Sequence, residues 1–89
     1  MDSALPGGDL IEAGVADLAR GVESIAALLV SIGAPRLRQL GFDLPRVIED
    51  AEHRLYWRLA SENSDAAHSR YNALVRRLVS FERAAECAD

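Results

Sequence analysis

The strongest constraint in this sequence is a run of apolar residues between Ile11 and Ile32 that recur at alternating steps of four and three. These steps keep an apolar side chain on one stripe of a helix, which is the a/d pattern of a packed helix–helix seam. The seam comprises Ile11, Val15, Leu18, Val22, Ile25, Leu29 and Ile32. We therefore predict one continuous helix that is capped by Asp9 and ends at about Ser31 or Ile32.

Other apolar residues flank this stripe on both sides. When each residue is projected at 100° per position, the apolar arc of the predicted helix covers roughly 200°, which is wider than a surface helix needs. Gly14 and Gly21 lie beside the seam, and each costs about 1 kcal/mol of helix propensity relative to Ala. Close approach of a neighbouring helix would offset that cost. We therefore place this helix at the centre of the fold, with neighbours on two sides.

Three further helices follow in the pattern. Residues 35–40 predict a short helix, Asp43 caps a helix that continues to residue 62, and Asp65 caps a last helix that reaches about residue 85. The last helix repeats the step of four and three. Its seam comprises Tyr71, Leu74, Leu78 and Phe81, flanked by Ala67 and Ala85.

The predicted fold is an all-α antiparallel bundle of three long helices and one short helix. Residues 1–8 read as a flexible leader, residues 9–86 as a single helical-bundle domain and residues 87–89 as a frayed tail. A chain of 89 residues buries a modest core, and helical oligomerisation is a common way to add stability. We therefore expect the chain to self-associate, as a homodimer.

Trp57 is the most unusual single residue, because its projection lies opposite the apolar face of its helix. An outward Trp among Arg and Tyr side chains is typical of a protein–protein hot spot. The alternative is that the short helix or the leader folds back and covers the indole. Val75 and Val79 also lie off their seam and either meet the short helix or belong to a second chain. The predicted interaction residues are Trp57, Tyr56, His53, Arg54, Arg46, Val75 and Val79.

No pattern in the sequence predicts catalysis, a cofactor or a metal site. Asp50 and His53 have a spacing that resembles a bundle metal motif, but they project away from the core, whereas metal ligands of helix bundles point inward. Cys87 lies near the end of the chain, where a catalytic thiol would lack a fixed base. We therefore expect a protein that is not an enzyme.

The composition favours a cytoplasmic, bacterial interaction protein. The longest apolar stretch, residues 25–30, is far shorter than the roughly 20 residues of a membrane span, and no signal peptide is visible. The formal net charge is −4, which does not favour nucleic acid as a partner.

The leading function is an adaptor or regulatory partner that acts through a helical surface. The alternative is a DNA-associated transcriptional regulator or antitoxin-like protein that uses Arg36, Arg38, Arg70, Arg76, Arg77 and Arg83.

Overall fold

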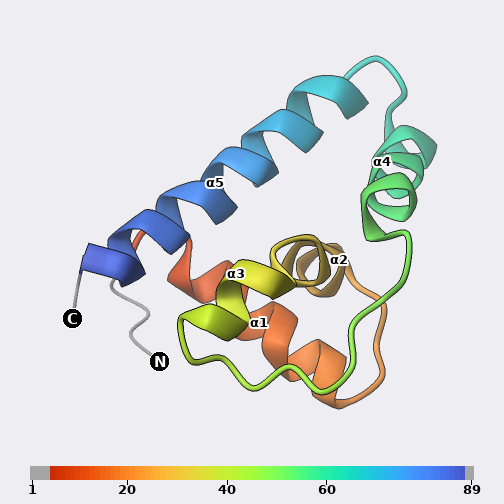
Figure 1. The fold of residues 1–89 in the computed structure, drawn as a ribbon. Coiled ribbons are helices and arrows are strands. Elements are labelled where there is room, and N and C mark those ends of the chain that lie inside the picture. Colours follow the sequence, from red (N-terminus) through yellow and green to blue (C-terminus); the bar gives the residue numbers. More distant parts are fainter. Residues whose placement is uncertain (1–4, 88–89) are drawn as a thin grey trace.

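Five helices form the regular structure of residues 5–87, the part of the chain that the computed structural model describes (Figure 1). In chain order they are α1 (Gly8–Ala19), α2 (Ile25–Ile32), α3 (Ala34–Gln39), α4 (Ala51–Glu62) and α5 (Ala67–Cys87). No strand occurs within residues 5–87, so the predicted all-α class is confirmed. The plan of three long helices and one short helix differs from the structure in two places. The first predicted helix is broken, and the third begins at Ala51 rather than after Asp43.

The first predicted helix is divided by a turn at residues 20–24. Gly21 adopts a φ of 73°, a left-handed conformation that no residue inside an α-helix has. Val22 lies in this turn with 45% of its surface exposed, so its assignment to a buried seam is wrong. The step of four and three continues across the turn because α1 and α2 both contribute apolar residues to the same core, among them Ile11 and Leu29.

Ser24 is the residue that starts the second half of the divided helix. Its Oγ accepts a hydrogen bond from the backbone N–H of Ala27 at 3.0 Å, which is N-cap geometry. The same hydroxyl donates to Oδ2 of Asp17 at 2.6 Å, and Asp17 also pairs with Arg20. These two contacts lower the pKa of the Asp17 carboxyl, the Ser24 hydrogen bond more than the Arg20 pair. The turn is thus held by a contact between Asp17 at the end of α1 and Ser24 at the start of α2.

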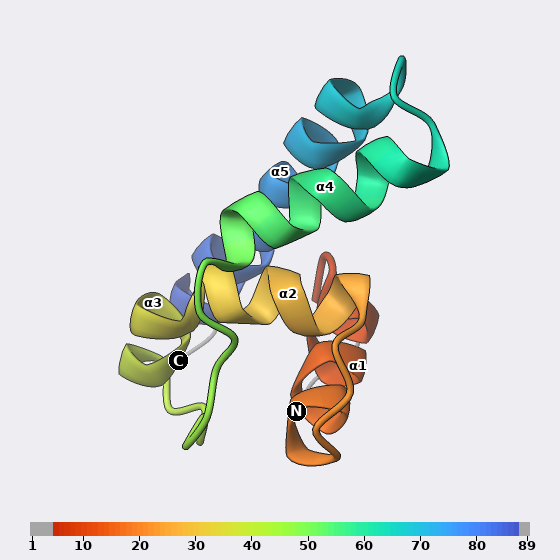
Figure 2. The same cartoon turned by 90° about the vertical axis from the view of Figure 1, so that its right-hand side faces the viewer.

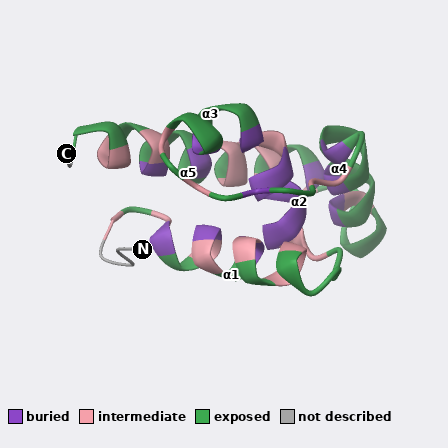
Figure 3. Cartoon of the chain, turned by 60° about the horizontal axis from the view of Figure 1, so that its bottom comes forward, coloured by how far each residue is buried: buried purple, intermediate pink, exposed green. Residues whose placement is uncertain are grey.

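Of the two helices that replace the predicted central helix, only α2 lies at the centre of the fold. Every residue from Ala26 to Ser31 is buried (Figure 3). In α1, by contrast, Gly8, Ile11 and Gly14 alone are buried, so this helix covers the core with one side. The prediction of a helix wrapped on two sides therefore holds for α2 and is wrong for α1.

The close approach expected at Gly14 is confirmed. A Cβ at this position would overlap the carbonyl group of Ala26 and the side chain of Val30, so only glycine allows α1 to lie this near to α2. The same expectation is wrong for Gly21, where an added Cβ would meet nothing within 4 Å. Gly21 is therefore needed for the left-handed backbone of the turn, and Gly14 for the close contact between α1 and α2.

The segment from residue 42 to residue 50 is irregular, although residues 44–50 were expected to be helical. Side chains satisfy its backbone groups in place of a helix. The guanidinium of Arg38 donates to the carbonyl of Leu44 at 3.0 and 2.6 Å, and Oγ of Ser31 accepts from the N–H of Ile48 at 3.0 Å. Asp50 has a φ of 56°, after which α4 begins. Asp43 is therefore not a helix cap.

The long helix α5 joins the two ends of the molecule (Figure 1). It packs beside α4, where Ala67 is buried, and against the central helix α2. Farther along, it lies against Gly7 at the start of α1. Phe81 meets Phe42 edge-to-face at 5.8 Å, and Leu78 lies against Gly33. Among the predicted seam residues, four are buried, six are half-buried against the core and one is exposed. In that order they are Ile11, Leu29, Leu78 and Phe81; Val15, Leu18, Ile25, Ile32, Tyr71 and Leu74; and Val22.

The two predicted end segments lie only partly within the described residues. Leu5 packs against the core and α1 starts at Gly8, so the ordered fold begins before the predicted boundary. Residues 1–4 and 88–89 lie outside the described part of the chain. Cys87, assigned to the frayed tail, is the exposed last residue of α5.

Candidate interaction surface

The outer side of α4 carries most of the predicted interaction residues. Trp57 is 69% exposed, and His53, Arg54 and Tyr56 on the same helix are also exposed. No described residue covers the indole, so the alternative in which the short helix or the leader shields it is wrong for residues 5–87. The rings of His53 and Trp57 lie 5.7 Å apart. The structure therefore presents an aromatic side chain to solvent on a regular helix.

The other predicted residues lie elsewhere. Tyr56 turns toward α5 and meets Tyr71 with the ring centroids 5.8 Å apart. Burial there raises the pKa of the Tyr71 hydroxyl, and the charge of Glu52 adds to the shift. Val75 is half-buried and Val79 is 36% exposed on α5. Neither valine lines the hollow that contains Trp57.

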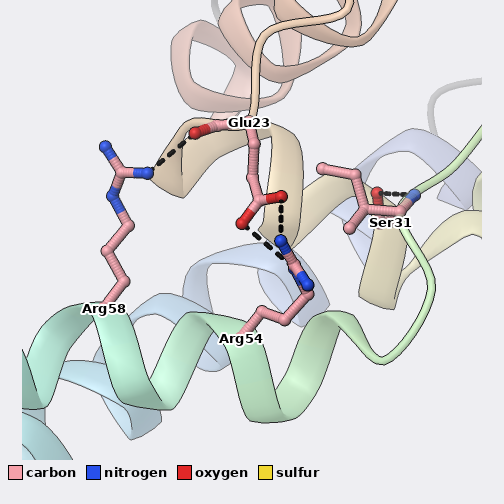
Figure 4. A network of polar contacts seen from close by, with 5 residues as sticks. Glu23, Ser31, Arg54 and Arg58 are labelled. Carbon is pink, nitrogen blue, oxygen red and sulfur yellow. Dashed lines mark hydrogen bonds and ion pairs between the residues drawn. The ribbon is translucent and has the colours of Figure 1, made fainter.

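Glu23 holds α4 against the turn between α1 and α2 (Figure 4). Its carboxylate accepts from Nε and Nη2 of Arg54 at 3.1 and 2.6 Å, and its backbone carbonyl accepts from Nη1 of Arg58 at 2.7 Å. The carboxylate raises the pKa of Arg54. An exposed pair of this kind stabilises the fold little, but its two-pronged geometry fixes the direction of α4. Trp57 lies on the helix between these two anchors.

Three hollows that share lining residues lie along α1, the turn at residues 20–24, the segment before α4 and α4 itself, elements whose arrangement Figure 2 shows. The largest, of about 430 Å³, separates α1 from the segment before α4, and we call it the Leu18 groove. The second, of about 180 Å³, shares Leu18, Gly21 and Arg46 with it, and the third, of about 340 Å³, shares Glu23 with the second. The Leu18 groove is lined by Val15, Leu18, Ala19, Gly21, Asp43, Leu44, Pro45 and Arg46.

The other two hollows extend this surface to the indole. The second is lined by Leu18, Gly21, Val22, Glu23, Arg46, Val47 and Ile48, and the third by Glu23, Arg54, Trp57 and Arg58. We call the residues that line the three hollows the Trp57 face. Arg46, predicted as an interaction residue, lines two of these hollows and so belongs to the face.

Sequence reasoning missed much of this face. A continuous first helix placed Leu18 and Val22 in a buried seam, and a helix from residue 43 left no groove beside them. The signal that could have revealed the break is the Gly21-Val22-Glu23-Ser24 stretch, in which a glycine precedes a good N-cap residue. Glu23 and Arg58 were missed because only the fold brings them together.

Most of the arginines considered for DNA binding are engaged with other groups. Arg36 pairs with Glu86, Arg70 with Glu62 at 2.8 Å, and Arg77 with Asp9 at 3.5 Å, while Arg38 donates to a backbone carbonyl. Arg76 and Arg83 have no ion-pair partner among residues 5–87, and neither does Arg38, whose guanidinium is bound to the carbonyl of Leu44. No observation on the described chain therefore favours the DNA-associated alternative.

The titratable groups considered for chemistry remain on the surface. Asp50 and His53 lie 3.4 Å apart with both side chains 70% exposed, and within residues 5–87 no three His, Cys, Asp or Glu side chains cluster as a metal site. Burial raises the pKa of Glu82, partly offset by Arg36, in a position that faces α3 rather than the Trp57 face.

Among the described helices, none combines the length and the apolar character needed to cross a membrane.

Comparison with known proteins adds no relative to this description: no protein-family model, curated protein or solved structure matches the chain.

Proposed function

We propose that this chain is a non-enzymatic protein–protein interaction module, an adaptor or regulatory partner that binds another polypeptide through the Trp57 face. The observation that carries the proposal is the 69% exposure of Trp57 on a helix that Glu23 holds in place through Arg54 and Arg58. Trp and Arg are the residue types that contribute most often to binding hot spots.

The exposed indole has a free-energy reason to bind. A fully buried aromatic side chain removes about 150–250 Å² from water, at about 25 cal/mol per Å². Covering the exposed part of Trp57 therefore contributes on the order of 3 kcal/mol before the entropic cost of association. Because Leu55 and Leu59 are fully buried and anchor α4 in the core, little ordering of the helix is needed on binding.

A photo-crosslinking experiment tests this function. Benzoylphenylalanine at position 53 lies one helical turn from Trp57 and leaves the indole in place, and the same probe at Ser80, an exposed position on α5, is the matched control. Irradiation in the cells of origin is expected to give a defined covalent adduct from position 53 and none from position 80. The adduct is expected to disappear in a W57A background.

Two results would overturn the proposal. One is the absence of any adduct at position 53, and the other is an adduct that forms equally from position 80 or persists without Trp57. An adduct to a second copy of the chain and an adduct to a different protein both support the function, and mass spectrometry separates the two.

A further inference from the structure

A protrusion and an unfilled hollow occur on the same face of this molecule. Trp57 projects from α4 at one end of the Trp57 face, and the Leu18 groove lies at the other. Val15, Leu18 and Leu44 give the groove an apolar lining. Its volume of about 430 Å³ falls within the range of pockets that hold drug-sized ligands, and an indole is smaller than these.

This arrangement is self-complementary under twofold symmetry. A twofold axis that lies in the interface, midway between Trp57 and the Leu18 groove and perpendicular to the line that joins them, places each indole over the groove of the other copy. A twofold interface repeats each contact twice, so both indoles are covered by one association. A different partner protein would need its own protrusion and hollow to cover both features.

One pair of charges at the two ends of the face is complementary, namely Arg58 beside Trp57 and Asp43 at the groove, which Arg46 also lines. Arg58 beside Trp57 donates only to the backbone carbonyl of Glu23, and Asp43 at the groove has no ion-pair partner among residues 5–87. The twofold arrangement brings Arg58 of one copy toward Asp43 of the other. Opposite charges on the two sides of an interface favour the correct partner and orientation.

A stable interface of average size buries about 800 Å² on each partner, which is roughly one-seventh of the 5463 Å² that this chain exposes. We infer that the partner bound by the Trp57 face is a second copy of this chain, with Trp57 of each protomer seated in the Leu18 groove of the other. This inference rests on the proposed function and names its partner.

Solution mass over a range of concentrations is the first test. In sedimentation velocity, the wild-type mass is expected to rise from 9.7 kDa toward twice that value between about 10 µM and 1 mM. W57A is expected to weaken dimerisation at least thirtyfold. Ala19, exposed at the end of α1, also lines the groove, so A19F fills the groove and is expected to give a monomer whose own indole is intact.

Charge exchange between copies is the sharper test. R58E and D43R each place like charges together in a homodimer, and each is expected to weaken dimerisation about tenfold. In a mixture of the two variants, the heterodimer contains two pairs of opposite charge. One is the native pair of Arg58 with Asp43, and the other is the same pair with its charges exchanged, so wild-type affinity is expected to return. Recovery in the mixture also shows that both variants are folded, and circular dichroism of each checks this independently.

Three outcomes overturn the inference: a wild-type chain that stays at monomer mass up to about 1 mM, a W57A dimer of unchanged affinity, or a variant mixture that does not recover. A Trp57-dependent photo-adduct to a different protein, together with a monomeric wild-type chain, would remove this inference and leave the proposed function standing. Absence of every adduct would remove both.

Discussion

The helices α1 and α2 come from one uninterrupted apolar pattern, yet they have different surroundings. Residues 26–31 of α2 are buried on all sides, whereas α1 buries one side and leaves Val15 and Leu18 half-exposed beside a groove. The turn at residues 20–24 makes this difference, because it changes the direction of the chain before the pattern is complete. An apolar repeat thus indicates that residues face a core, but it does not show that they share one helix.

The largest expected loss of stability distinguishes the buried helix α2 from the partly exposed helix α1. L29A removes a side chain that is fully buried in α2, and it is expected to lower the free energy of unfolding by about 2–5 kcal/mol because a cavity remains. L18A in α1 is the matched control, with an expected loss of about 1 kcal/mol because Leu18 is half-exposed. Urea unfolding of both variants measures the difference. Equal losses would mean that α1 is as deeply packed as α2.

The contact between α1 and α2 is tested at Gly14. A methyl group there overlaps the Ala26 carbonyl group and the Val30 side chain, so G14A is expected to cost about 1–3 kcal/mol. Helix propensity alone predicts the opposite, a gain of about 1 kcal/mol. G21A is the control: it meets open space and is expected to cost about 1 kcal/mol through its positive φ alone. A more stable G14A protein would contradict the close packing of these helices.

The break between the two helices is tested at Ser24. S24A removes the N-cap of α2 and is expected to cost about 1 kcal/mol in thermal or urea unfolding. Ser61 also bears a hydroxyl, which accepts no backbone N–H in the structure and donates to the carbonyl of Arg58, so S61A provides a control with a smaller expected effect. If α1 and α2 formed one helix, replacing Ser24 by Ala would instead stabilise the protein.

The same turn gives the protein a predictable response to acid. The pKa of Asp17 is lowered in the folded state by the hydroxyl of Ser24 and then by Arg20. Its contribution to stability is therefore complete above the ordinary Asp value of about 4 and is lost as the pH falls through the lower folded value. S24A removes the principal cause, so unfolding free energy measured from pH 6 to pH 2 is expected to fall less steeply in this variant than in the wild type. Identical slopes would exclude the Ser24–Asp17 contact.

The smallest expected effect concerns the link from the turn to α4. A double-mutant cycle with E23A and R54A is expected to give a small favourable coupling that weakens with added salt, because both side chains are partly exposed. The same cycle on Glu62 and Arg70 provides a comparison at the other end of α4. A coupling of zero at Glu23 and Arg54 would mean that α4 is held by packing alone.

The sequence was sufficient for the helical class and for part of the core. Leu55, Leu59, Leu78 and Phe81 are apolar at helical spacing, and all four are buried. Local signals also placed the short helix near residues 34–39 and the polar turn before α5. These features depend on neighbours along the chain, which periodicity and turn residues record.

The groove could not be predicted because it depends on contacts between distant residues. The hydroxyl of Ser31 holds the N–H of Ile48, and the guanidinium of Arg38 holds the carbonyl of Leu44, so a stretch with acceptable helix signals stays irregular. No local pattern records such contacts. Trp57 was identified because its position opposite the apolar face is itself a local property.

Fluorescence of Trp57, the one tryptophan in the chain, tests the central claim most directly. In dilute solution the account predicts the emission of a water-exposed indole and efficient quenching by acrylamide. As the concentration rises, emission is expected to shift to the blue and quenching to fall, with the same midpoint as the increase in mass. An indole that is already shielded in the dilute monomer would contradict the open Trp57 face, and one that stays fully exposed in the dimer would contradict its seating in the Leu18 groove.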